Sequence, residues 1–258
     1  MKYRAHFRYL CLALLISVLP PQATASESLQ ALLERTGKTI ASFTDQFSEV
    51  TCTELVTQSK LNKNGKTDYQ EESSFDLLVT LNAAAGDLTL EESRLPIRVA
   101  KRTKQVPLLV SNGFSTLLLV FHPYYQRHFE FALLEDVVPG KPVRVSFRHL
   151  KNTPSPSALL LRGREYPLEL AGTAWIDPQS ATISRVSAEL AAGMEDVGLR
   201  VFQSDVQYAP VMLPGLSQPY WLPETAAIDV ETLRQHWKNL HRFTRYKRFS
   251  VSTDSSTP

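Results

Sequence analysis

The chain has 258 residues, of which 43% are hydrophobic and 21% charged, so it can build a packed core and does not have the composition of a disordered protein. Its 28 basic and 26 acidic side chains give a formal charge of +2, which offers no electrostatic case for a nucleic-acid binder. Two cysteines are too few for a cysteine-rich metal site or a disulfide framework.

The first 25 residues have the three parts of a signal peptide. Lys2, Arg4 and Arg8 are basic, residues 10–19 are apolar, and Ala23-Thr24-Ala25 matches an A-x-A cleavage site. We therefore expect cleavage after Ala25 and a periplasmic or secreted protein. The alternative is an uncleaved anchor, but ten apolar residues fall short of the roughly 20 that span a bilayer. No second long apolar run follows, so no transmembrane span is expected after cleavage.

The segment after the leader has helical periodicity. Apolar residues recur at three- and four-residue steps, which predicts an amphipathic helix over residues 28–48. Ser26 or Ser28 can cap its start, and Gly37 is expected to interrupt or loosen it.

After Val50 the period changes to two, which is typical of strands. A hairpin turn is predicted at 62–66, where Asn64 precedes Gly65, and the return strand covers 75–81. A further strand is expected over 88–94. This part of the chain is therefore predicted to be an antiparallel meander.

The middle of the chain begins with an apolar stretch that predicts a short buried helix over 112–121. Pro123 ends this helix, because proline disfavours helix in the residue before it. Strands are predicted over 127–134 and 143–148, and a surface loop over 152–157.

The last hundred residues are predicted to form a second meander with turns at 177–180 and 214–215. Its expected strands cover 166–176, 182–190, 202–208, 220–223, 225–233 and 243–252. The sequence thus predicts an α+β fold, mostly antiparallel β, as a single domain over 26–253, with a disordered tail over 254–258.

No catalytic motif is present. Cys52 would be the single cysteine after cleavage and is interpreted as a half-buried strand residue rather than a nucleophile. The pairs His122/His128 and His236/His241 have no local carboxylate, so neither a metal nor a cofactor is expected. Four acidic residues could form the paired carboxylates of a glycosidase, but solvated strand edges are the favoured interpretation. They are Glu71, Glu72, Glu91 and Glu92.

The densest basic patch lies near the C-terminus, interleaved with aromatic residues. It would suit anionic lipid head groups or a polyanion, and a solvated strand face explains it equally well. Its residues are Lys238, Arg242, Arg245, Lys247 and Arg248.

Several of these features together resemble the exported superfamily of periplasmic lipoprotein carriers, the LolA-like proteins, over about residues 40–253. The motifs are Gly172-Thr173-Ala174-Trp175-Ile176-Asp177-Pro178, Thr182-Ile183-Ser184-Arg185-Val186 and Tyr220-Trp221-Leu222-Pro223. The resemblance implies a bent, incomplete β-barrel, or half-barrel. An N-terminal helix and a short buried helix would cover its concave face, which can hold acyl chains. The region 100–165 departs from the family pattern as an insertion.

The resulting hypothesis is a non-enzymatic exported protein that binds an apolar ligand, a lipid or a lipoprotein acyl chain, in the groove of a curved sheet. The alternative is an envelope interaction or assembly module whose barrel is filled by its own side chains and whose partner is another envelope protein. An enzyme ranks last. The candidate groove residues, each of which would also suit a plain core, are Phe43, Phe47, Leu77, Val79, Leu117, Leu118 and Trp175.

Overall fold

The computed structural model of the chain describes residues 28–47, 50–82, 88–98, 114–134, 138, 140–161 and 164–248. The predicted signal peptide and the predicted C-terminal tail both lie outside these residues. No helix in the described ranges is both long and apolar enough to cross a membrane.

The fold consists mostly of strands, with a few helices between them. The helices are α1 (Leu29–Phe47), α2 (Phe114–Leu119), α3 (Pro123–Gln126) and a short 3-10 turn, η1 (Glu195–Val197). The strands are β1 (Val50–Leu61), β2 (Thr67–Asn82), β3 (Thr89–Arg98), β4 (Phe129–Leu133), β5 (Val143–His149), β6 (Ala158–Leu161), β7 (Arg164–Pro167), β8 (Leu170–Ile176), β9 (Ile183–Leu190), β10 (Leu199–Val211), β11 (Tyr220–Thr232) and β12 (His236–Arg248).

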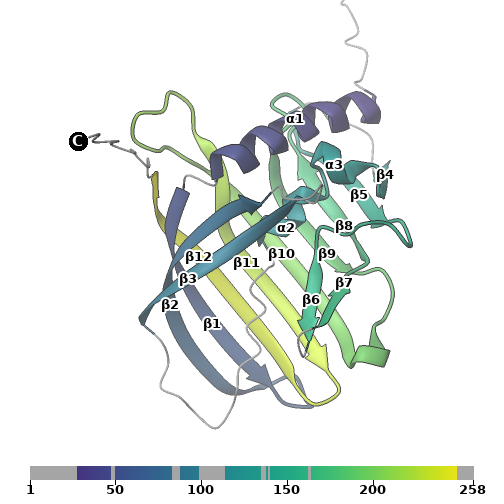
Figure 1. The fold of residues 1–258 in the computed structure, drawn as a ribbon, viewed down its shortest axis with the longest axis vertical. Coiled ribbons are helices and arrows are strands. Elements are labelled where there is room, and N and C mark those ends of the chain that lie inside the picture. The colour runs from purple at the N-terminus through teal and green to yellow at the C-terminus, as the bar shows by residue number, and fades with distance from the viewer. Residues whose placement is uncertain are drawn as a thin grey trace, which may run out of the picture.

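Ten strands form one antiparallel sheet in the order β3-β2-β1-β12-β11-β10-β9-β8-β5-β4, and β6 with β7 forms a separate hairpin. The last strand, β12, pairs with the first, β1, so the two meanders join in the middle of the sheet. The outermost strands, β3 and β4, are not paired with each other, and the sheet stays open. Figure 1 shows it as a strongly curved sheet with α1 lying across one end. The predicted fold class, a bent and incomplete antiparallel barrel with helices on its concave face, is confirmed.

α1 begins where the sequence predicted and runs without interruption. Ser28 caps it by accepting a hydrogen bond from the backbone N–H of Ala31 at 3.2 Å. The expected break at Gly37 is wrong. A Cβ at Gly37 would lie 2.9 Å from Nε2 of Gln126 and 3.3 Å from the carbonyl oxygen of Phe121. Glycine therefore allows α1 to pack closely on the segment that contains α2 and α3.

The predicted buried helix is confirmed as α2, and its last three residues, 117–119, are deeply buried. Leu119 is 0% exposed, and so is Phe121, which follows the helix. A strand was expected to follow directly, but Pro123 starts a second helix, α3, before β4 begins. Proline suits the first position of a helix because its missing N–H would have no partner there. His122 caps this helix, accepting a hydrogen bond at Nδ1 from the N–H of Tyr124 at 3.1 Å.

Two of the predicted turns are closed by side chains that bond to nearby backbone N–H groups. Oδ1 of Asn62 accepts hydrogen bonds from the N–H groups of Asn64 and Lys66, and Gly65 has a φ of 74°. At the other turn, Oδ1 of Asp177 accepts hydrogen bonds from the N–H groups of Gln179 and Ser180. These side chains fix the two hairpins locally.

β12 differs from its prediction in two ways. It starts at His236 rather than at Phe243. The sequence did not reveal the first half of the strand, because polar residues on both of its faces hide the alternation of apolar and polar residues. It also carries a bulge opposite Thr51 and Thr53, where Arg245 has a left-handed φ of 55°. The bulge shifts the alternation of inward and outward side chains by one residue. Phe243 is buried, and the next aromatic side chain that packs against the core is Tyr246, three positions later.

Candidate functional site

A groove of about 610 Å³ lies between α1 and the ends of the strands beneath it. We call it the α1 groove. Its walls come from three regions: α1 and α2, the β8–β9 turn with the start of β9, and the end of β10 with the loop into β11. Its lining residues are Lys38, Thr39, Ile40, Ser42, Phe43, Leu118, Ser180, Thr182, Ile183, Tyr208, Gln218, Pro219, Tyr220 and Trp221.

α1 forms one wall because its apolar stripe faces the sheet. Ile40 is 3% exposed and belongs to the hydrophobic core, and Phe43, one turn further, packs against that core while remaining partly exposed. Arg35 fixes the helix to the β8–β9 turn by donating hydrogen bonds to the carbonyl oxygens of Pro178 and Gln179. Apolar packing and this polar clamp therefore both hold α1 over the sheet.

The floor of the groove is apolar and joins the core. Leu118 and Ile183 are buried, at 2% and 3% exposure, and Tyr208 is 5% exposed. Burial raises the pKa of Tyr208 far above its ordinary value of 10.0, so its phenol stays neutral. The polar lining residues lie around this floor, and Lys38 is the one that carries a formal charge among the described lining residues.

The predicted groove residues separate into three groups. Phe43 and Leu118 line the α1 groove. Leu77, Val79 and Leu117 are each 1% exposed and belong to the hydrophobic core, outside the lining of the groove.

The other two predicted residues are not brought to the groove. The side chain of Phe47 lies outside the described part of the chain. Trp175 is on the opposite face of the sheet, because its neighbours Ala174 and Ile176 are 0% exposed and strand residues alternate between faces. There the guanidinium of Arg185 lies over its ring, 4.5 Å from the centroid.

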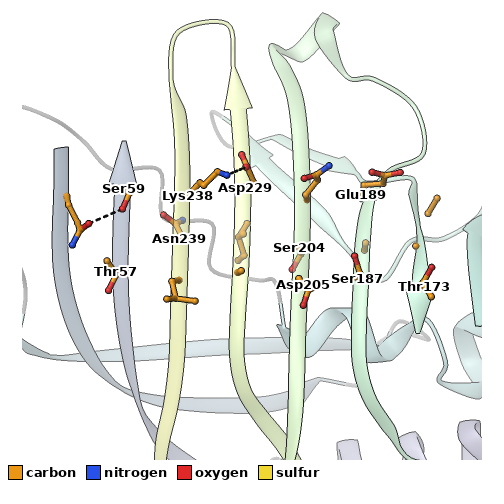
Figure 2. Close-up of a pocket in the computed structure, with 18 residues that line it drawn as sticks. Thr57, Ser59, Thr173, Ser187, Glu189, Ser204, Asp205, Asp229, Lys238 and Asn239 are labelled. Carbon is orange, nitrogen blue, oxygen red and sulfur yellow. Dashed lines mark hydrogen bonds and ion pairs between the residues drawn. The ribbon is translucent and has the colours of Figure 1, made fainter. Parts of the chain in front are cut away.

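The opposite, polar face of the sheet contains a second hollow, of about 730 Å³, that crosses seven strands. Figure 2 shows the side chains that line this hollow, and among them Lys238 points to Asp229 on the neighbouring strand. The Lys238 ammonium lies 3.1 Å from a carboxylate oxygen of Asp229, and Arg185 pairs with Asp205 next to the hollow. Lys238 and Asp205 each have an oppositely charged partner here, and the lining mixes polar side chains with small and apolar ones such as Ala227 and Leu240.

The predicted basic patch is spread along β12 rather than gathered at one point. All five residues are exposed. Lys238 is paired with Asp229, Arg242 lies beside a smaller hollow of about 340 Å³ on the polar face, and Arg245 sits at the bulge. Whether this patch binds an anionic surface stays a prediction.

A buried charge cluster lies inside the curved sheet, and the sequence analysis missed it. The carboxylate of Glu54, 0% exposed, accepts hydrogen bonds from Nε and Nη2 of Arg94 at 2.6 and 3.0 Å and from Nδ1 of His241 at 2.7 Å. Arg94 also pairs with Glu92 at 2.8 Å. The interpretation of Glu92 as a solvated edge residue is therefore wrong, since its side chain is 1% exposed.

The cluster joins three strands, because Glu54 is on β1, Arg94 on β3 and His241 on β12. Burial by itself would raise the pKa of Glu54, but the hydrogen bonds from His241 and Arg94 outweigh it and the pKa is lowered. The imidazole was expected to have no carboxylate partner because Glu54 is 187 residues away in sequence. The available signal was a charged residue on the buried side of β1, between Cys52 and Val56.

Neither the cluster nor Cys52 forms an accessible reactive site. Cys52 is 5% exposed, and burial together with the charge of Glu54 raises the pKa of its thiol to about 12. The cysteine is thus more deeply buried than the half-buried position expected. Within the described ranges, no group of three or more His, Cys, Asp or Glu side chains is arranged to hold a metal ion. The α1 groove is the candidate functional site.

Comparisons with known proteins add the following findings. No protein-family model matches this chain, and no curated protein matches it. A DUF1329 family protein from Desulfovibrio piger is similar over 89% of this chain and 97% of its own, with 12% identity and a TM-score of 0.41. A domain from Vibrio parahaemolyticus, named for outer membrane lipoprotein sorting, is similar over 86% of this chain and 94% of its own, also with 12% identity and a TM-score of 0.41. Membership of the LolA-like superfamily stays a prediction, and the function proposed next rests on the residues of this chain.

Proposed function

We propose that this chain is a non-enzymatic exported protein that binds an apolar ligand, a lipid or a lipoprotein acyl chain, in the α1 groove. The observation that carries the proposal is the apolar floor of the groove. It is formed by buried side chains such as Leu118 and Ile183, yet it is open at a polar rim. An acyl chain would extend the hydrophobic core outwards while its head group stayed in water.

The size of the groove supports this class of ligand. A volume of about 610 Å³ lies within the range of roughly 300–1,000 Å³ that is usual for small-molecule sites. Each methylene moved from water to such a floor contributes about 0.8 kcal/mol before the costs of association. A chain of ten or so carbons can therefore bind usefully without any specific polar contact.

Export is part of the proposal and rests on the leader over residues 1–25. A periplasmic or secreted protein with such a groove would meet its lipid or lipoprotein at the cell envelope. Intact-mass analysis of exported material should show a mature chain that starts at Ser26.

An envelope interaction module is the second candidate function. Two observations favour it: the interior of the curved sheet contains fully buried large side chains such as Trp237 and Phe147, and the unpaired edge strand β3 exposes Leu95 and Ile97, at 68% and 56%. An edge of this kind is suited to strand addition by a protein partner.

Native mass spectrometry of the protein purified from its own host tests the first proposal. A co-purified lipid is expected on the wild-type chain. Ser42→Trp would fill the groove from its exposed rim without touching the core, and should lose the lipid. Gln30→Trp adds the same indole to an exposed position of α1 outside the groove and should retain it. Equal lipid occupancy in both variants, or none in the wild type, would contradict the proposal.

A further inference from the structure

The rim of the α1 groove has an asymmetric charge. Lys38 is the charged member of the described lining residues, and none of the described carboxylates lies within ion-pair distance of its ammonium. The closest acidic residue on the same face of α1, Glu34, lies one turn earlier and accepts a hydrogen bond from Gln30. The ammonium of Lys38 is thus left to the solvent and to whatever occupies the groove.

Two neighbouring charges of opposite sign lie next to the rim. Asp177 is the acidic residue of the adjacent β8–β9 turn, and its Oδ1 already accepts hydrogen bonds from the N–H groups of Gln179 and Ser180 and from the Ser180 hydroxyl. These bonds, led by the backbone N–H of Ser180, lower the pKa of Asp177. Arg35 donates to neutral carbonyl oxygens of this turn, and its positive charge also helps to lower the pKa of Asp177. The charges of Arg35 and Asp177 therefore offset each other, and Lys38 supplies the positive charge of the groove lining.

One uncharged donor completes the rim. The exposed amide of Gln218 lies in the loop that forms the facing wall, and it can donate to the oxygens of a head group. The Ser180 hydroxyl donates to Asp177 and accepts from the Thr182 hydroxyl at 2.7 Å, so both of these protons are already used within the turn. A positively charged head group, by contrast, would meet Lys38 with no carboxylate of the described lining to offset it.

From this arrangement we propose that the α1 groove selects amphiphiles with an anionic head group, a carboxylate or a phosphate, and that Lys38 pairs with it. This inference rests on the proposed function, because the apolar floor must first hold the chain. An ion pair at an exposed rim contributes modestly, so Lys38 is expected to improve affinity by about two- to fivefold.

The test compares amphiphiles that share one twelve-carbon chain. Dodecanoate, dodecyl phosphate, dodecanol and dodecyltrimethylammonium are titrated into the mature protein by calorimetry at pH 7.5 and low salt. The wild type should bind one or both anions about two- to fivefold more tightly than dodecanol, and the cation more weakly. The comparison of dodecanoate with dodecyl phosphate identifies which head group the rim prefers. Added salt should reduce the anion preference, because exposed charges are screened.

Two variants separate the inference from the proposed function. Lys38→Met should remove the difference in affinity between the anions and dodecanol, whereas Lys38→Arg should keep it. If all four amphiphiles bind the wild type equally, or Lys38→Met weakens all of them alike, the head-group inference is overturned while acyl binding stands. If dodecanol and the anions all fail to bind, the proposed function fails and this inference with it.

Discussion

At the scale of single residues, the strongest electrostatic feature is the carboxylate of Glu54. Removing water from a charged group is costly, and the cost is recovered here by three hydrogen bonds from two partners. Arg94 reaches Glu54 from β3, two positions away in the sheet order. The pair therefore stabilises the inward curl of the sheet edge as well as the interior.

Glu54→Gln should destabilise the protein by about 3–5 kcal/mol, because it leaves Arg94 buried without its full counter-charge. Urea denaturation of the variant and the wild type measures this loss. Asp205→Asn is the matched control on the polar face, where Arg185 is 44% exposed, and it should cost less than about 1 kcal/mol. Similar losses in the two variants would show that the buried cluster is not specially stabilising.

The same carboxylate should make stability depend on pH. Its pKa is lower in the folded protein than the ordinary value of 4.5, so its contribution is complete above that value and is lost as the pH falls through the lower, folded pKa. The free energy of unfolding should therefore fall more steeply below about pH 4.5 in the wild type than in Glu54→Gln. Asp177 titrates with the same sign, so Asp177→Asn is measured in parallel. Superimposable profiles for the wild type and Glu54→Gln would contradict this assignment.

At the scale of elements, the close contact between α1 and α3 makes glycine preferable to alanine at position 37, although alanine is usually the better helix residue. Gly37→Ala would usually stabilise a helix by about 1 kcal/mol. Here the added Cβ would press on Gln126, whose amide donates to the carbonyl oxygens of Leu33 and Phe121 at 2.8 Å in both cases. We expect a net loss of about 1 kcal/mol by urea denaturation.

A second substitution checks the cause of this loss. In a Gln126→Ala background the amide is absent, so the added cost of Gly37→Ala should shrink or change sign. An unchanged cost would mean that the carbonyl oxygen of Phe121 or the ring of Pro123, rather than Gln126, limits the approach.

The bulge in β12 gives the opposite expectation for glycine. Arg245 has a φ of 55°, a conformation that costs an L-residue energy and glycine almost none. Arg245→Gly should raise the free energy of unfolding by about 0.5–1 kcal/mol. Arg242→Gly, in the regular part of the same strand, should lower it by a similar amount. A loss in both variants would show that the arginine side chain matters more than the backbone at the bulge.

Local chemistry explains which elements were predictable. The hairpin at Gly65 and the turn at Asp177 follow from side chains that bond their own backbone, and α1 follows from its periodicity. α3 and the first half of β12 did not follow, because Pro123 both stops and starts helices and because residues such as Asn239 and His241 are polar on a buried face. These positions make sense only with their partners on distant strands.

At the scale of the whole molecule, some residues of the candidate site could be predicted from local sequence, and others depend on contacts between distant strands. Phe43 and Leu118 could be predicted because each lies in an amphipathic helix. Tyr208 and Trp221 reach the groove through strand pairing, and Trp175 was assigned to it wrongly because its strand alone does not show which face is covered. The sheet stays open between β3 and β4, and the buried charge cluster links β1, β3 and β12 within it.

Whether this curved interior is a carrier or a self-filled module can be decided with two large-to-small substitutions. Leu119 is 0% exposed and outside the groove lining, so Leu119→Ala should cost about 2–5 kcal/mol through lost burial and a cavity. Phe43 lines the groove and is partly exposed, so Phe43→Ala should cost clearly less in the free protein.

Dodecanoate should then distinguish the two functions, because a ligand that binds the folded state alone stabilises it according to its affinity. In a carrier, dodecanoate raises the unfolding free energy of the wild type and of Leu119→Ala by the same increment, and that of Phe43→Ala by much less. Urea denaturation with and without the ligand measures these increments. If dodecanoate stabilises none of the three proteins, and Phe43→Ala costs as much as Leu119→Ala, the groove is filled by the protein's own side chains. The envelope interaction module would then be the better account of this fold.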